Sequence, residues 1–270
     1  MNRRITNYSL MAIIGLLHII PFFLLFNLAF KSPQDPSSKW VPPSYLYTDN
    51  FANAWQNAFL DKALVSNFLI TTTTVFLVVV IGSLAAYPLA RFPTRWNNLV
   101  YVLCVSCMIV PALTILVPLY KLMVDIGGIN TYWGIILCHV TFFLPITIFL
   151  FTGFIKSIPR ELDEAGLIDG CSRVMIFFRI IIPLLKPAVS TVVILVGFSV
   201  WNDYQFSIFF LQKRSVQTIP VALSQFVSQY QNNINWVAAG ALLSTLPVLV
   251  VYLFLQKYVI KGLTEGAIKA

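Results

Sequence analysis

The sequence is poor in charged residues. Only 10% of its 270 residues are Asp, Glu, Lys or Arg, while 58% are hydrophobic, against roughly 25% charged residues in ordinary soluble domains. So few charges cannot cover the surface of a soluble chain of this length, and the mean hydropathy of +0.81 agrees. A water-soluble globular protein is therefore excluded, and we predict an integral membrane protein whose apolar excess faces lipid.

The chain also has few residues that carry catalytic or metal chemistry. Cys104 and Cys107 have C-x-x-C spacing, but they lie in an apolar run without a second pair, which argues against a metal or redox role. His18 and His139 also fall in apolar runs, where an interhelical hydrogen bond is favoured over a proton relay or ligation. We expect no catalytic residue, no metal site and no cofactor, and a membrane enzyme is the weakest interpretation.

Six apolar runs are long enough to cross a membrane, since a span takes about 20 residues. The first run follows Arg3 and Arg4, as in a secretory signal, but it exceeds the core of about 7–15 residues typical of a cleaved signal. We interpret it as a retained span. The sequence thus predicts an all-α, polytopic, single transmembrane domain over 1–270, with spans at about 8–30, 63–89, 99–123, 131–154, 184–206 and 236–258.

The distribution of basic residues predicts the orientation. With the N-terminus inside, twelve of the 18 Lys and Arg residues fall in the inner segments and six in the outer ones. An excess of Lys and Arg marks the cytoplasmic side. Both termini are therefore predicted to be cytoplasmic, and the net charge of +8 is a topology signal rather than a sign of nucleic-acid binding.

The inner connection between spans four and five, at about 155–183, concentrates eight charged residues, and a ninth, Lys186, follows at its exit. Ser157 is a plausible helix cap, and acidic residues follow it where they suit the positive end of a helix dipole. We predict a helix over about 159–169 ended by Gly170, then a second helix over 173–182 that Pro183 closes. The result is a helix–turn–helix elbow on the cytoplasmic face.

A motif in this elbow resembles a known family. Glu164-Ala165-Gly166, then three residues, Gly170, nine residues and Ile180-Ile181-Ile182-Pro183 are similar to the EAA loop of permease subunits of binding-protein-dependent ABC importers. That pattern is E-A-A, three residues, G, nine residues, I-x-L-P. This sequence departs from it at Gly166, in place of alanine, and at Ile182, in place of leucine, while the spacing is intact.

Other segments extend the resemblance over most of the chain. Asn67 and the segments 85–92, 129–134, 201–203 and 262–267 resemble the maltose-type branch of carbohydrate importers, in particular its smaller, six-span permease subunit. The resemblance implies a type I ABC importer permease fold in a bacterial inner membrane. It also implies that the chain imports a mono- or oligosaccharide without being an enzyme itself.

The resemblance further implies the partners. These are a second, homologous permease, two copies of a cytoplasmic ABC ATPase, and an extracytoplasmic sugar-binding protein, with no nucleic acid. In the family the EAA elbow is the helix that couples the permease to the ATPase. Carried over, the coupling residues are Glu164, Ala165, Gly166, Asp169, Gly170, Ile180 and Pro183.

Candidate residues for the pore or the subunit interface are fewer and less specific. Groups suited to hydrogen bonding with a sugar or a partner chain occur near the span ends, at Asn67, Tyr120, Asn202, Asp203 and Tyr204. An acid near a span is a functional candidate, but Asp203 could equally cap a helix or bridge to the partner subunit. The sequence does not select among these residues.

The alternative function is a secondary transporter or channel driven by an ion gradient. Such a protein is expected to carry paired acids or bases within its spans, or an internal repeat. The span interiors lack carboxylates apart from Asp203, and the two halves show no evident self-similarity. The ABC importer is therefore favoured.

Overall fold

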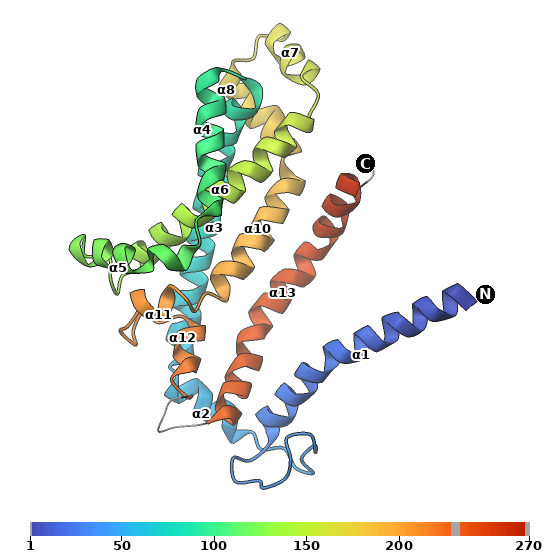
Figure 1. Cartoon of the computed structure of the whole chain (residues 1–270), viewed down its shortest axis with the longest axis vertical. Helices are drawn as coiled ribbons and strands as arrows, with labels where there is room; N and C mark the ends of the chain where they lie inside the picture. Colours follow the sequence, from blue (N-terminus) through green and yellow to red (C-terminus); the bar gives the residue numbers. More distant parts are fainter. Residues whose placement is uncertain (1, 228–232, 268–270) are drawn as a thin grey trace. The chain divides into compact units, whose positions relative to one another are not determined.

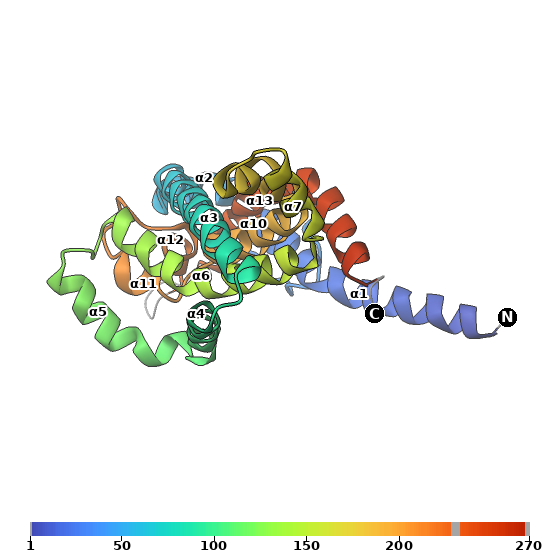
Figure 2. The same cartoon turned by 90° about the horizontal axis from the view of Figure 1, so that it is seen from above.

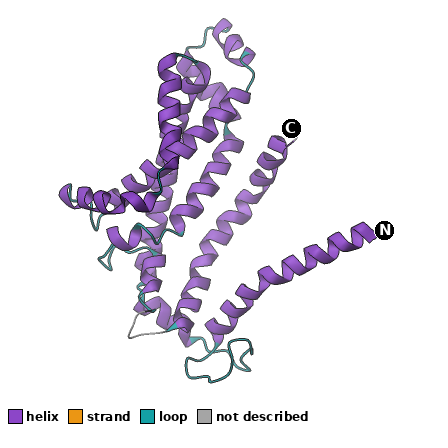
Figure 3. Cartoon of the chain, viewed as in Figure 1, coloured by secondary structure: helices purple, strands orange, loops and turns teal. Residues whose placement is uncertain are grey.

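The structure is a computed structural model that describes residues 2–227 and 233–267. This part of the chain is helical, with no β-strand (Figure 3), which confirms the predicted all-α class. Short 3-10 turns lie at Cys107–Ile109 and Ala112–Ile115, and a π-helical turn at Phe177–Ile181. The α-helices are α1 (Asn2–Phe30), α2 (Asp49–Asn57), α3 (Leu60–Arg91), α4 (Arg95–Ser106), α5 (Leu116–Asp125), α6 (Tyr132–Ser157), α7 (Glu161–Ile168), α8 (Arg173–Ile176), α9 (Ile182–Leu184), α10 (Lys186–Trp201), α11 (Ser207–Phe210), α12 (Ile219–Ser224) and α13 (Ile234–Ala267).

Four helices in the described part of the chain are long and apolar enough to cross a membrane. Two further candidates are helix pairs bent at a break, and counting each pair as one span makes six, the number that the sequence predicts. The four single helices or helix segments are Asn7–Phe30, Leu60–Arg91, Tyr132–Ser157 and Ile234–Phe254.

The first bent pair divides the segment predicted as a span over 99–123. The helices Arg95–Ile109 and Ala112–Asp125 meet at 90°, and Figure 2 shows α5 turning away from α4. The break lies at Val110 and Pro111, both in extended conformation, because a residue before proline is disfavoured in the α region. Pro145, in contrast, is accommodated inside α6.

The second bent pair carries the elbow back into the apolar segment. Ser172 caps α8, its hydroxyl accepting a hydrogen bond from the Met175 N–H at 3.3 Å. The chain then passes through the π-helical turn and α9, and it bends by 69° before α10. Proline occupies the first turns of both α9 and α10, where its missing N–H is tolerated. The predicted helix over 173–182 is thus a composite that continues past Pro183 to Leu184.

The chain divides into two compact units: unit 1 is Met1–Leu64 with Thr218–Pro247, and unit 2 is Val65–Gln217 with Val248–Ala270. Unit 1 is organised around the C-terminal end of α1. Asn50 donates from Nδ2 to the carbonyls of Ala29 and Lys31 at 2.9 and 2.8 Å, and Asn235 donates to those of Leu28 and Lys31 at 3.0 and 2.8 Å. Side-chain amides therefore satisfy carbonyls that a helix end leaves unpaired.

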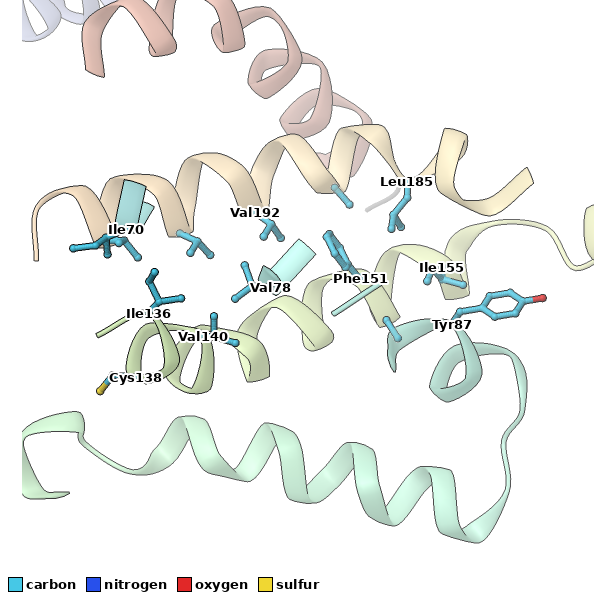
Figure 4. Close-up of a cluster of buried hydrophobic side chains, with 14 of the residues drawn as sticks. Ile70, Val78, Tyr87, Ile136, Cys138, Val140, Phe151, Ile155, Leu185 and Val192 are labelled. Carbon is cyan, nitrogen blue, oxygen red and sulfur yellow. The ribbon is translucent and has the colours of Figure 1, made fainter. Parts of the chain in front are cut away.

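Unit 2 has its core where α3, α6 and α10 meet. Val78, Phe151 and Val192 are fully buried there, and Figure 4 shows them directed toward one another from the three helices. Gly82 allows α3 and α6 to approach closely, because a Cβ at this position would lie 2.5 Å from Cγ2 of Thr147. This packed unit supports the elbow at one end.

Candidate functional site

The elbow begins where α6 ends. Ile158 is extended, at φ −76° and ψ 129°, ahead of Pro159, since proline disfavours helical conformation in the preceding residue. α7 follows, two residues later than predicted, and it lies beside α8 at one end of unit 2 (Figure 1). Its first turn is acidic, which complements the helix dipole, and carries Glu161, Asp163 and Glu164.

Gly170 ends α7, as the sequence predicts. Its φ of +81° lies in the left-handed region that favours glycine. The N–H of Gly170 donates to the Leu167 carbonyl at 3.1 Å, and the N–H of Cys171 donates to the Gly166 carbonyl at 2.9 Å. This pair of bonds is the Schellman closure of a helix C-terminus, and it fixes the sharp reversal between the two arms of the elbow.

The two faces of α7 differ in character. Gly166 is buried against the second arm, where a Cβ would lie 3.1 Å from both Ile176 Cγ1 and Ile180 Cδ1. The opposite side exposes apolar residues, with Ile168 86% and Leu167 50% accessible. A charged segment that presents a large exposed isoleucine has the character of a contact surface.

The remaining predicted coupling residues take different places in the elbow. Glu164, Ala165 and Asp169 are exposed on α7, and Pro183 is exposed in α9. Ile180 is half-buried and lies below Gly166. The structure therefore brings Glu164, Ala165, Asp169 and Gly170 to the surface, while Gly166 and Ile180 pack inside the elbow.

A buried polar cluster joins α7 to the end of α3. Arg91 Nη2 lies 2.8 Å from Asp163 Oδ2, and the two side chains are 5% and 16% exposed. Arg91 also donates from Nη1 to the Ile158 carbonyl at 3.0 Å, and Tyr87 donates from Oη to Asp163 Oδ1 at 3.2 Å. One guanidinium thus contacts both α7 and the residue that ends α6.

Aromatic contacts link α3 to the second arm as well. The Arg173 guanidinium lies over the Phe92 ring, 4.8 Å from its centroid, in a cation–π arrangement. The ring of Tyr87 lies 5.3 Å from that of Phe177 and 6.1 Å from that of Phe92, centroid to centroid. Both arms of the elbow are therefore held by the last turn of α3 and the residue after it.

The pairing of Arg91 with Asp163 was not predicted from the sequence. The available signal was weak. Tyr87 and Arg91 are four residues apart in a helix, so they share one face, and a basic residue pointing from a helix end into protein needs an acidic partner. Several acids of the elbow could have supplied it, and the sequence does not distinguish among them.

Two of the predicted pore or interface residues are engaged inside unit 2. Asn67 is buried and donates to the Trp201 carbonyl at 3.0 Å. Asp203 accepts from the Ser207 N–H and Oγ at 2.9 and 2.7 Å and from the Phe206 N–H at 3.2 Å. Its Oδ2 lies 3.6 Å from His139 Nε2. Asp203 thus accepts hydrogen bonds from the N–H groups of Phe206 and Ser207 at the start of α11, a helix-end role that is one of the alternatives the sequence left open.

The other three candidates are more accessible. Asn202 and Tyr204 are exposed after α10, although Asn202 donates to the Phe198 carbonyl at 2.8 Å. The Tyr120 hydroxyl in α5 accepts from Gln212 Nε2 at 3.4 Å. The five residues are therefore divided between buried helix-to-helix contacts and exposed polar groups rather than gathered into one sugar site.

The described residues contain no group of three or more His, Cys, Asp or Glu that could hold a metal ion. The four cysteines are free thiols, and Cys107 donates to the Leu103 carbonyl at 3.3 Å within its own helix.

Known proteins similar to this chain are membrane transport subunits. Residues 78–265 match the family described as binding-protein-dependent transport system inner membrane component. The melibiose/raffinose/stachyose import permease protein MelC of Bacillus subtilis is 46% identical over 261 residues, which cover 96% of this chain and 95% of that protein. The trehalose transport system permease protein SugB of Mycobacterium tuberculosis is 30% identical over 253 residues, covering 93% and 92% of the two chains.

A solved structure shares the fold. A chain of a bacterial ABC transporter involved in the import of the acidic polysaccharide alginate superposes with a TM-score of 0.81 over 94% of this chain and 95% of that chain, at 22% identity. This likeness supports the predicted importer permease architecture.

Proposed function

We propose that α7 couples this chain to an ATPase. The chain belongs to the family of binding-protein-dependent transport system inner membrane components. It is a carbohydrate import permease subunit of an ABC transporter. The chain is a non-catalytic, multi-pass membrane protein, and the ion-gradient alternative is set aside. In the proposed assembly it pairs with a second, homologous permease, two copies of a cytoplasmic ATPase bind from the inner side, and a sugar-binding protein docks outside. Both termini then face the cytoplasm.

The observation that supports this coupling role is the exposed apolar face of α7. Ile168 and Leu167 are exposed on a short helix whose first turn is acidic. Exposed apolar residues rimmed by polar ones are typical of protein interfaces. We assign the contact surface to Glu164, Ala165, Leu167, Ile168 and Asp169, and we assign Gly166 and Gly170 to shaping the elbow that carries it.

The mechanism follows from the rigidity of the elbow. Closure of the two ATPases on ATP moves the docked α7, and the packing of Gly166 against Ile176 and Ile180 transmits that movement to the second arm. The second arm leads through α9 into α10, so the displacement reaches α10. ATP then favours one of two pore conformations by binding that state more tightly.

The test is substitution of Ile168 in the assembled transporter. We expect Ile168→Glu to insert normally but to lose the ATPase on purification in mild detergent, because a charge would be buried in an apolar contact. The matched control Ile168→Val keeps an apolar side chain and is expected to retain the ATPase and sugar uptake. Full recovery of the ATPase with Ile168→Glu, together with normal uptake, would show that α7 is not the docking helix.

We propose melibiose, raffinose and stachyose as the substrates. The 46% identity to the import permease named for these sugars extends over nearly the whole of both chains, whereas the trehalose permease is 30% identical. Uptake of each labelled sugar, and of trehalose, should be measured in cells with and without this chain. Loss of trehalose uptake alone on deletion would contradict the assignment.

A further inference from the structure

We propose that Arg91, Tyr87 and Asp163 form a positioning link that makes α7 and α3 move together when the ATPase acts. We refer to these three residues as the α3–α7 link. The proposal rests on the role of α7 proposed above and adds the route by which its movement reaches a second span. None of the three residues was singled out as a coupling residue from the motif.

The contacts of the α3–α7 link join three segments at one point. Arg91 is the last residue of α3, and its guanidinium reaches Asp163 in α7 and the carbonyl of Ile158 at the end of α6, at 2.8 and 3.0 Å. Tyr87, one turn earlier in α3, holds the second carboxylate oxygen of Asp163 at 3.2 Å. Two residues of one helix face therefore contact both oxygens of a single carboxylate, Tyr87 by a hydrogen bond and Arg91 as an ion pair.

A second set of contacts, through Gly166, joins α7 to the second arm of the elbow. Gly166 packs against Ile176 and Ile180, which lead covalently into α10. The α3–α7 link reaches α3, to which α7 has no short covalent connection. A displacement of α7 is thus delivered to α10 by packing and chain continuity. It is delivered to α3 directly by the link, while the Arg173–Phe92 and Tyr87–Phe177 contacts join α3 to the second arm.

Stability alone does not account for such a cluster. Replacing a buried ion pair with apolar residues of similar size is often neutral or stabilising, and α3 is already anchored by 32 helical residues whose side chains include the fully buried Ile70, Val78 and Ala86. Contacts at both carboxylate oxygens of Asp163 add a constraint on the angle between α3 and α7. With this angle constrained, a movement of α7 is accompanied by a movement of α3.

The experiment measures coupling rather than activity alone. The complete transporter is reconstituted in proteoliposomes with its sugar-binding protein, and sugar imported per ATP hydrolysed is compared for the native chain, Asp163→Asn, Arg91→Gln and the double variant. We expect each single variant to lower this ratio roughly tenfold, within the range of coupling energies between sites, while ATP hydrolysis continues. Glu161→Gln, which removes an exposed carboxylate from the same turn of α7, is the matched control and should keep the native ratio.

The double variant separates positioning from structural support. It leaves no unpaired buried charge, so the complex should regain the thermal stability that the single variants lose. The ratio of sugar imported to ATP hydrolysed should stay low, because the contacts between Arg91 and Asp163 are absent. Recovery of that ratio along with stability would reduce the link to a structural role and overturn the proposal.

A failure of this proposal is distinguishable from a failure of the docking role. If Ile168→Glu releases the ATPase but Asp163→Asn transports with the native ratio, α7 docks and the link does not transmit. If neither variant changes binding or coupling, the role of α7 itself is wrong.

Discussion

Two aspartates in unit 2, Asp203 and Asp163, differ in where their carboxylates find hydrogen-bond partners. Asp203 takes its hydrogen bonds from Phe206 and Ser207, three and four residues along its own chain. Asp163 takes its partners from α3, and its hydrogen-bonded partner Tyr87 lies 76 positions away. A carboxylate satisfied locally fixes one turn of the chain, whereas one satisfied at a distance fixes the relation between two helices.

The largest expected effect is that of removing the distant partner. Arg91→Ala leaves the Asp163 carboxylate without its counter-charge and the Ile158 carbonyl without a donor, and breaking a buried pair in this way costs about 3–5 kcal/mol. We expect the lower end, because Asp163 is 16% exposed. Thermal unfolding in detergent should show the loss, with Arg91→Lys, which retains the charge, losing less. Equal stability of the two variants would show that the charge contributes nothing.

A smaller effect is expected at the locally satisfied aspartate. Asp203→Ala removes the acceptor of the Phe206 and Ser207 N–H groups, and loss of such a side-chain acceptor at a helix start costs about 0.5–2 kcal/mol. Asp203→Asn keeps one acceptor oxygen and should recover part of this. The measurement is the same unfolding transition, and a loss larger than that of Arg91→Ala would reverse the ranking of the two regions.

The third effect, comparable in size to the second, is expected at Gly170, in the turn that ends α7. Gly170→Ala places a Cβ at φ +81°, which is unfavourable by about 1–2 kcal/mol in the left-handed region. Asn tolerates that region better, so Gly170→Asn should be less destabilised. Hydrogen exchange at the amides of residues 166–171 should rise in the alanine variant, and unchanged exchange would contradict the closure described for this turn.

The smallest effect concerns a third aspartate, in the loop after α1 in unit 1. Hydrogen bonds from the Ser37 side chain, from Tyr45 and from the Ser37 N–H lower the pKa of Asp35 from 3.8 to about 2. A lowered pKa in the folded state means that the contribution to stability is complete above the ordinary pKa and disappears as pH falls from about 4 to about 2. Carboxyl chemical shifts followed with pH should show this low midpoint. A midpoint near 4 would mean that this local set of bonds does not hold in solution.

Much of the elbow could be predicted from the sequence because its determinants are local. Proline before α7, acids in its first turn and Gly170 at its end act over a few residues, so the spacing alone predicts helix, reversal and helix. The orientation of α7 could not be predicted in the same way. Gly166 belongs to the motif, yet it packs inward against Ile176 and Ile180, because the second arm lies on that side.

The position at which a predicted span breaks could not be predicted from the sequence either. Long apolar runs predict helices, and proline indicates where they are weak, but Pro145 remains inside α6 while the chain bends by 90° at Pro111. Pro111 is exposed and Pro145 is half-buried, and neighbouring helices can compensate for the hydrogen bond that a proline removes.

Composition, the length of the apolar runs and one spaced motif were sufficient to predict a helical membrane protein with a helix–turn–helix elbow that resembles importer permeases, because these properties depend on residues that are close in the chain or on their total number. Only the tertiary structure decided which acid pairs with Arg91, which face of α7 is exposed and which polar residues serve helix packing. These depend on distances between segments far apart in sequence, and such distances are set by how α3, α6 and α10 pack.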